Sequence, residues 1–240
     1  DKFKGYPDYE DPDFNTKIFS KKEFNINTIP ERKDLNDLEK ELFSKKLCDP
    51  MYNKTEEEKK TIPFKLTENQ KFLKSFLSPN TPYNSMLLFH GTGVGKTCSS
   101  ISIAEQYSQQ LKKLNKKVII LLNPSIEANF VKNIFNIQKI IKETPYYQCT
   151  GSKYLDEIKI DLDIFNTMRD EEKKKIQEQI QSKISKIIKG RYEFYGYQKF
   201  ANLIENIQQK IKEKYDETNY NNYFNKELKK RFSNTVMIID

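Results

Sequence analysis

Residues 86–97 constrain the fold of this 240-residue chain more than any other stretch. A short apolar run over residues 86–89 predicts a buried strand that leads into a glycine-rich turn and then into a helix beginning near Lys96. Three glycines allow positive φ in that turn and let successive backbone N–H groups surround an anion: Gly91, Gly93 and Gly95. The positive end of the helix dipole points to the same place. The segment therefore predicts a phosphate-binding loop between a strand and a helix.

The side chains that follow the loop indicate which phosphates it would hold. Lys96 would reach the β- and γ-phosphates of a nucleotide, and the Thr97 hydroxyl would ligate Mg²⁺. The cradle itself would consist of Gly91, Thr92, Gly93, Val94 and Gly95. The strict pattern has a glycine where this chain has His90. The alternative is a glycine-rich turn that binds no ligand.

A second apolar run, over residues 236–239, ends in Asp240. An aspartate at the end of a neighbouring strand holds the Mg²⁺ shell in nucleotide hydrolases with this kind of loop. We therefore expect Lys96 and Asp240 to be the catalytic pair, with Thr97 and Asp240 at the metal. The residue that would activate the attacking water lies just after this aspartate. We expect residues 1–240 alone to hydrolyse ATP poorly or not at all.

Alternating periodicities along the rest of the chain predict an α/β fold, a parallel sheet with helices on both faces. Further strands are expected over residues 117–122, 146–149, 193–197 and 235–240. Helices are expected over residues 34–47, 67–77, 96–111, 126–142, 167–189 and 199–215, and a polar loop and a short helix precede residue 235. Thr67 and Gln70 predict a capping box for the second helix, and Thr167 with Asp170 one for the fifth, which Gly190 would end.

Residues 1–63 form an irregular extension with scattered aromatic side chains, which either straps across the domain or stays mobile until a partner binds. Residues 1–60 carry a net charge of −2, so +10 lies in residues 61–240. A basic balance suits a phosphate backbone, although a solvated lysine surface is the alternative. Three scattered cysteines favour a reducing compartment over a disulfide framework or a zinc site. No apolar run is long enough for a membrane span.

Together these motifs resemble a superfamily 2 helicase-type ATPase. The resemblance rests on residues 89–97, on residues 236–240 and on Gln70 ahead of the first strand. It is closer to the viral branch that includes the poxvirus early transcription factor small subunit and nucleoside triphosphatase I. Residues 77–83 leading into residues 88–95 are its most specific part. It covers residues 64–240, which implies a first RecA-like domain that stops at the Walker B strand and carries a helical insertion at about residues 152–190.

The resemblance implies roles for several further residues. Gln70 would read the adenine ring, with the capping role above as the alternative. Backbone contacts to nucleic acid would come from loops at strand ends, at Pro124, Ser125, Thr150, Gly151 and Lys199. Ordinary loops beside strand ends are the alternative for each of them.

The expected function is ATP hydrolysis coupled to movement along DNA or RNA, with ATP and Mg²⁺ as cofactors. A second RecA-like domain of the same protein would supply an arginine, and a viral RNA polymerase is a further expected partner. The resemblance places such a protein in a cytoplasmic virus factory or in the virion, without a membrane partner. Two rivals are a packaging-motor or assembly ATPase of the phosphate-loop type, and a binding module with a vestigial loop.

Overall fold

The computed structural model describes residues 3–28, 36–48, 54–55, 57–58, 64–89, 91, 93, 95–141, 148–215 and 217–240. The chain forms two compact units, each made of two segments. Unit 1 comprises Asp1–Gln106 and Asn133–Gln181, and unit 2 comprises Tyr107–Lys132 and Ser182–Asp240. In the described part of the chain, no helix is both long and apolar enough to cross a membrane.

Unit 2 is built on a parallel sheet of three strands in the order β2-β1-β3. These are β1 (Val118–Leu121), β2 (Tyr192–Tyr195) and β3 (Met237–Ile239). Ile119 of the central strand is in register with Glu193 on one side and with Met237 on the other. All four residues of β1 are buried, and alternate residues of a strand face opposite sides, so both faces are covered at this strand. The predicted α/β class and parallel pairing are confirmed.

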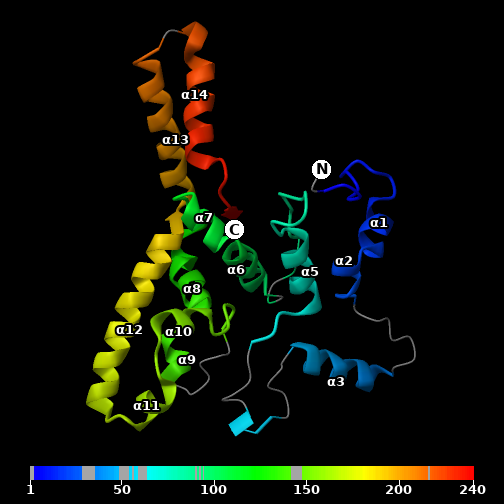
Figure 1. The fold of residues 1–240 in the computed structure, drawn as a ribbon, viewed down its shortest axis with the longest axis vertical. Coiled ribbons are helices and arrows are strands. Elements are labelled where there is room, and N and C mark those ends of the chain that lie inside the picture. The colour runs from blue at the N-terminus through cyan, green and yellow to red at the C-terminus, as the bar shows by residue number, and fades with distance from the viewer. Residues whose placement is uncertain are drawn as a thin grey trace. The chain divides into compact units, whose positions relative to one another are not determined.

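Helices connect these strands, and two of them form a hairpin. The helices of unit 2 are α7 (Ser108–Lys113), most of α8 (Pro124–Ile134), the second half of α12 (Asp170–Arg191), α13 (Tyr197–Lys212) and α14 (Glu217–Phe232). Figure 1 shows α13 and α14 side by side as an antiparallel pair, and the two helices are in contact. Near the hairpin turn the rings of Tyr215 and Tyr223 stack with their centroids 3.6 Å apart.

Unit 1 consists mainly of helices. They are α1 (Phe14–Ser20), α2 (Lys22–Asn25), α3 (Asp37–Cys48), α5 (Glu68–Phe76), α6 (Lys96–Gln106), α9 (Ile137–Ile141), α10 (Lys153–Ile158), α11 (Leu162–Thr167) and the first half of α12 (Asp170–Arg191). The predicted capping box of α5 is present. The Gln70 N–H donates to Thr67 Oγ1 over 3.3 Å, and the Thr67 N–H donates to Gln70 Oε1 over 3.0 Å.

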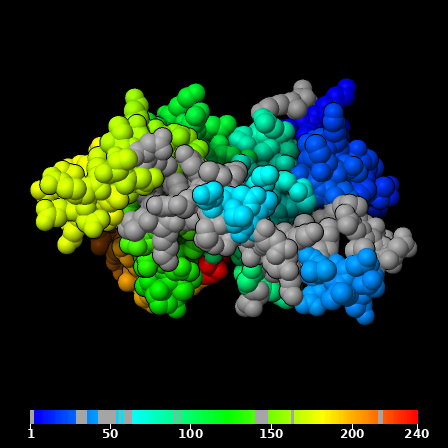
Figure 2. Space-filling model, turned by 90° about the horizontal axis from the view of Figure 1, so that it is seen from below, coloured from blue at the N-terminus to red at the C-terminus, as the bar shows by residue number. Residues whose placement is uncertain are grey.

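The described N-terminal residues 3–28 pack on α5 through aromatic side chains. The cluster comprises Tyr6, Phe14, Ile18, Phe24, Phe72, Phe76, Leu77, Tyr83 and Met86. The rings of Phe76 and Tyr83 stack with centroids 4.3 Å apart, and the Tyr83 hydroxyl donates to the Pro7 carbonyl over 2.9 Å. The space-filling view likewise shows the blue N-terminal residues against the teal atoms of α5 (Figure 2). Of the two alternatives for the extension, residues 3–28 therefore form a strap that packs on the domain and are not a mobile segment.

Hydrogen bonding and burial in this cluster shift the pKa values of three ionisable groups. The Tyr6 hydroxyl donates to Glu23 Oε1 over 2.7 Å, which raises the pKa of Tyr6 to about 12 and lowers the pKa of the Glu23 carboxyl. Burial, with added repulsion from Tyr9 and two aspartates, raises the pKa of Tyr83 to about 12 as well. Both tyrosines are therefore neutral hydrogen-bond donors over the physiological pH range.

One predicted strand is wrong, and a second is wrong at the residues that the structure describes. Residues 86–89 are irregular, with Leu87 89% exposed and Phe89 96% exposed, because no described strand lies beside them to share backbone hydrogen bonds. Of the predicted strand 146–149, residues 148 and 149 lie in a bend and turn, and the other two lie outside the described residues. The strand before Asp240 forms as an outer strand of the described sheet, and Met237 and Ile239, which share one face, are exposed rather than covered.

Four helix predictions also need correction. The helix after the loop ends at Gln106, and α7 follows as a separate element. The helix expected over residues 126–142 divides into α8 and α9, where the Asn136 N–H donates to the Gln148 side chain over 2.7 Å. Thr167 ends α11 instead of capping α12, whose helix runs through Gly190 to Arg191. The short helix expected before residue 235 is the 16-residue α14.

Candidate nucleotide site

Two of the three glycines in the predicted phosphate loop have the positive φ that was expected of them. Gly93 has φ +80° and Gly95 has φ +81°, in the left-handed region that L side chains avoid. Gly91 lies outside that region, so positive φ is wrong for this residue. His90, Thr92 and Val94 lie outside the described residues.

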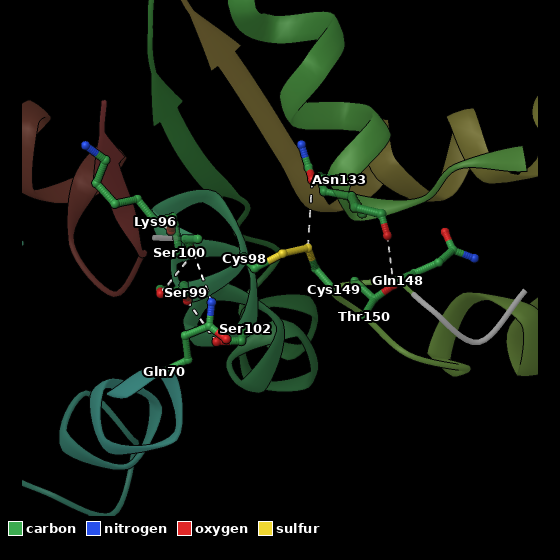
Figure 3. Close-up of a disulfide and its surroundings, with 12 residues drawn as sticks. Gln70, Lys96, Cys98, Ser99, Ser100, Ser102, Asn133, Gln148, Cys149 and Thr150 are labelled. Carbon is green, nitrogen blue, oxygen red and sulfur yellow. Dashed lines mark hydrogen bonds between the residues drawn. A yellow bond between two sulfur atoms is a disulfide. The ribbon is translucent and has the colours of Figure 1, made fainter. Parts of the chain in front are cut away.

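The carbonyl of Gly95 is the best-anchored atom of the site. It accepts the Ser99 N–H over 3.0 Å, the Ser99 hydroxyl over 3.2 Å and the Gln70 amide over 3.1 Å. The carbonyl and the N–H of one trans peptide point in opposite directions. Fixing this carbonyl along the helix therefore fixes the Lys96 N–H outward, at the beginning of α6, where an anion would bind. Figure 3 shows Gln70 reaching toward this end of the helix beside Ser99 and Ser100.

Gln70 connects α5 to the loop through both ends of its amide. Its oxygen accepts from Thr67 N–H, its nitrogen donates to Gly95, and the residue is only 5% exposed. A methyl group on Gly95 would approach the Gln70 nitrogen to 2.5 Å, so a glycine is required here by contact as well as by φ. An amide has two N–H donors and two acceptor lone pairs, so these bonds use half of its capacity.

Lys96 and Thr97 occupy the first turn of α6, as predicted, and both are half-buried. The Lys96 carbonyl accepts the Ser100 hydroxyl over 3.1 Å, which continues the pattern of serines bracing this turn. A threonine hydroxyl is a hard oxygen ligand of the kind that Mg²⁺ accepts. Among the described residues no group of three or more His, Cys, Asp or Glu side chains could hold a metal ion by themselves. A site here would thus depend on Thr97, one carboxylate and the phosphates of the nucleotide.

Asp240 lies in unit 2, where it follows β3. Its N–H donates to the Leu121 carbonyl over 2.9 Å, and its carbonyl accepts the Tyr197 hydroxyl. Pro124 begins α8 just after β1, and a Cβ on Gly196, which follows β2, would lie 3.0 Å from the Pro124 ring. The loops after all three strands therefore meet at one edge of the sheet.

Three of the predicted nucleic-acid residues lie at this carboxyl edge. Pro124 and Ser125 open α8, and the Ser125 N–H and hydroxyl both donate to Asn123 Oδ1 over 3.0 Å. Lys199 is exposed, and its ammonium lies 5.7 Å from the centre of the Tyr195 ring. The structure brings these residues together with Asp240 within unit 2.

Thr150 and Gly151 belong to unit 1. The Thr150 hydroxyl donates to the Ile134 carbonyl over 2.8 Å, and Gly151 has φ +57° with open space where a Cβ would be. The preceding residue, Cys149, forms a disulfide with Cys98 of α6, with the two Cα atoms 5.2 Å apart (Figure 3). The expectation that the cysteines form no disulfide is therefore wrong for this pair. Their 51-residue separation gave no signal, because only the fold brings them together.

A second connection joins the end of α6 to α10. The Glu105 carboxylate is nearly buried and accepts hydrogen bonds from Lys153 Nζ at 2.5 Å and from the Tyr154 hydroxyl at 2.7 Å. A carboxylate taken from water is stabilised by such a charged donor and a neutral donor together. Sequence reasoning missed Glu105, Lys153 and Ser99, since none of them lies in a recognisable motif.

Comparisons with known proteins find relatives among large DNA viruses. The chain is 35% identical over 150 residues to the mimivirus protein named "Putative ATP-dependent RNA helicase L377", which covers 62% of this chain and 11% of that protein. It is 31% identical over 137 residues to the mimivirus "Putative ATP-dependent RNA helicase R563", covering 57% of this chain and 20% of that protein. It is 30% identical over 151 residues to "Putative helicase 009L" of Frog virus 3, covering 62% and 13%.

The chain therefore spans about a tenth to a fifth of the length of these relatives. No protein-family model matches it, and no solved structure does. What the comparisons define is a similarity to helicase-named proteins of mimivirus and of Frog virus 3.

Proposed function

We propose that residues 64–240 are the first RecA-like, ATP-binding domain of a nucleic-acid-dependent ATPase of superfamily 2, preceded by an extension over residues 1–63. The observation that carries the proposal is the Gly95 carbonyl, which accepts hydrogen bonds from three donors at the start of α6. Gly93 and Gly95 both have positive φ, and Lys96 follows them at the first position of the helix. The viral relatives with helicase names support it. The segment around residues 152–190, including most of α12, is an insertion in this domain.

Each residue of the proposed ATP site has its own role. The N–H groups of the cradle and the Lys96 ammonium bind the phosphates of ATP, and Gln70 reads the adenine edge with the remaining half of its amide capacity. Thr97 and Asp240 would hold Mg²⁺, which would supply charge neutralisation at the phosphates of ATP. An arginine from a second RecA-like domain of the same protein stabilises the transition state.

Nucleic acid, DNA or RNA, binds through backbone contacts at Pro124, Ser125 and Lys199, and at Thr150 and Gly151. Hydrolysis opens and closes the cleft between the two domains and moves the protein along the strand. The setting is viral transcription or replication, with a viral RNA polymerase as a further partner. Of the two locations expected, the virion suits a Cys98–Cys149 disulfide better than the reducing cytoplasm does.

The test is Mg-ATP turnover by a chain extended past Asp240, with and without single-stranded DNA or RNA. We expect stimulation by one polymer and its loss in Lys96→Ala, because the ammonium supplies phosphate binding. Turnover that neither polymer changes would favour the motor or assembly ATPase. Undiminished turnover in Lys96→Ala would contradict the proposal, and no Mg-ATP binding at all would leave the binding module.

A further inference from the structure

The amino ends of the three strands carry an unusual concentration of positive charge. Each strand of the parallel sheet is preceded by the end of a helix: α7 precedes β1, α12 precedes β2 and α14 precedes β3. The last turn of each helix is basic. Together with the lysines just before β1, and leaving out the half-buried Arg191 of α12, these cations form what we call the basic rim: Lys112, Lys113, Lys116, Lys117, Lys189, Lys229, Lys230 and Arg231.

Hydrogen bonds show that two parts of the basic rim are adjacent. The Lys116 ammonium donates to the carbonyls of Lys230 and Arg231, over 2.5 Å and 2.9 Å. The Thr235 hydroxyl donates to the Lys117 carbonyl. The register of β1 with β2 and β3 places the end of α12 beside them. With strands about 4.8 Å apart, the three amino ends span about 10 Å.

Few negative charges offset the rim. The sequence has no Asp or Glu between Glu105 and Glu127, and none between Glu227 and Asp240. Glu193 lies 4.0 Å from Lys117 and Glu227 lies 3.7 Å from Lys230, both as exposed or half-exposed pairs. Three helix C-termini add about −1.5 charges in total. The rim has eight cations, and two carboxylates and three helix C-termini oppose them. Several positive charges remain in excess, which is more than is needed to neutralise the helix dipoles.

The rim is separate from the residues already considered for nucleic acid. Pro124, Ser125 and Lys199 follow the carboxyl ends of the strands, whereas the rim precedes the amino ends, about 13 Å away across four-residue strands. Lys112, Lys113, Lys189, Lys229, Lys230 and Arg231 are all exposed.

We propose that the basic rim is a second nucleic-acid site, which binds the phosphate backbone without reading sequence. This inference rests on nucleic acid being the partner of the proposed ATPase, and charge complementarity selects a polyanion. With contacts at both edges of the sheet, unit 2 holds the nucleic acid at the rim as well as at the carboxyl edge. We expect the affinity of the basic rim for nucleic acid to be the same with and without bound ATP, because no rim residue belongs to the phosphate loop.

The test is equilibrium binding of the full chain to a labelled mixed-sequence oligonucleotide, single-stranded and duplex, over a series of salt concentrations without ATP. The rim variant replaces Lys112, Lys113, Lys229 and Lys230 by Gln. The matched control removes the same charge from exposed lysines of unit 1, by Lys→Gln at Lys4, Lys22, Lys174 and Lys175. A variant with Arg at the four rim positions keeps the charge and checks that folding is intact.

Each phosphate contact contributes about 0.7 to 0.9 to the slope of log affinity against log salt. With four lysines replaced, we expect the rim variant to lose about three from that slope and at least about tenfold in affinity. The control and the arginine variant should keep the slope of the unmodified chain. An equal loss in rim variant and control, or no loss in either, would overturn the proposal, and the second result would point to an acidic protein as the partner.

A second measurement locates the contact directly. Leu114 is 54% exposed between Lys113 and Lys116, so a photoreactive phenylalanine analogue there should crosslink to the oligonucleotide. The same analogue at Leu38 of unit 1, 69% exposed, should not crosslink. No crosslink at Leu114 would overturn the location. Because these assays contain no ATP, they are independent of the turnover test with Lys96→Ala.

Discussion

Gly95 is constrained both by its backbone conformation and by contact with Gln70. Its φ of +81° disfavours any side chain, and a Cβ would press on the Gln70 amide. We expect Gly95→Ala to cost about 1 to 3 kcal/mol of stability. It should also weaken Mg-ATP binding at least tenfold, since the carbonyl anchor and the Lys96 N–H would shift together.

The control for this prediction is Gly91→Ala. Gly91 lies outside the left-handed region and a Cβ there meets nothing within 4 Å, so its thermal stability should stay near that of the unmodified chain. Thermal unfolding and Mg-ATP titration of both variants check the prediction. Equal stability losses for the two glycines would contradict it.

Gln70 makes one hydrogen bond to Thr67 and one to Gly95, and a substitution can show which of them affects nucleotide binding. Gln70→Glu keeps an oxygen that accepts the Thr67 N–H, so the capping box of α5 should survive. The same change removes the donor to the Gly95 carbonyl and places a carboxylate against it. We expect weaker Mg-ATP binding with a helix cap that still forms.

Thr67→Ala is the complementary variant. It should cost about 0.5 to 2 kcal/mol in denaturant unfolding through loss of the cap, with a smaller effect on nucleotide binding. If Gln70→Glu binds Mg-ATP as well as the unmodified chain does, Gln70 acts only as a helix cap.

The N-terminal strap matters because it packs directly on α5, the helix that carries Gln70. Phe24 is 2% exposed and contacts the rings of Phe72 and Phe76. Phe24→Ala should cost about 3 to 5 kcal/mol in chemical unfolding, because it removes a buried ring and leaves a cavity. Phe19, in the same segment but 55% exposed, provides a control: Phe19→Ala should change stability by about 0.5 kcal/mol or less. Similar costs for the two would mean that the strap is not held by burial.

Local signals in the sequence were enough for those elements whose stability is local. The capping box of α5 and the start of α6 at Lys96 follow from side chains within one turn, and the structure has both. The strand at residues 86–89 failed because an apolar run forms a strand only beside another strand, and local pattern does not supply a neighbour. The break between α8 and α9 depends on the Gln148 side chain, twelve residues from Asn136, which periodicity cannot detect.

Within the candidate site, the glycine conformations at two of three positions and the place of Lys96 and Thr97 were predictable from spacing. The bonds that hold the Gly95 carbonyl were not, since Ser99 belongs to no motif and Gln70 is 25 residues away. The Glu105 contacts with Lys153 and Tyr154 also come from tertiary packing across 48 and 49 residues. Motifs thus identified the loop but not what braces it.

The Cys98–Cys149 disulfide ties the helix of the phosphate loop to the turn that holds Thr150 and Gly151. It closes a loop of about 50 residues, for which chain entropy predicts a stabilisation of about 4 kcal/mol. A thiol reductant should therefore lower the unfolding temperature of the unmodified chain and leave that of a Cys98→Ser, Cys149→Ser variant unchanged. A reductant effect of equal size in both proteins would show that this bond does not contribute.

The strand order has a consequence for how the protein is made. β1 pairs with residues about 70 and about 120 positions later in the chain, so neither edge of this apolar strand can be satisfied locally. At ribosomal rates of about 5 to 20 residues per second, β1 waits on the order of ten seconds for β3 to be synthesised. During that interval the backbone N–H and C=O groups of Val118–Leu121 are unpaired and its apolar side chains are exposed. Pairing between strands so far apart in the sequence is also slow. Yield in expression should therefore depend on chaperone supply during this interval more than on the stability of the finished fold.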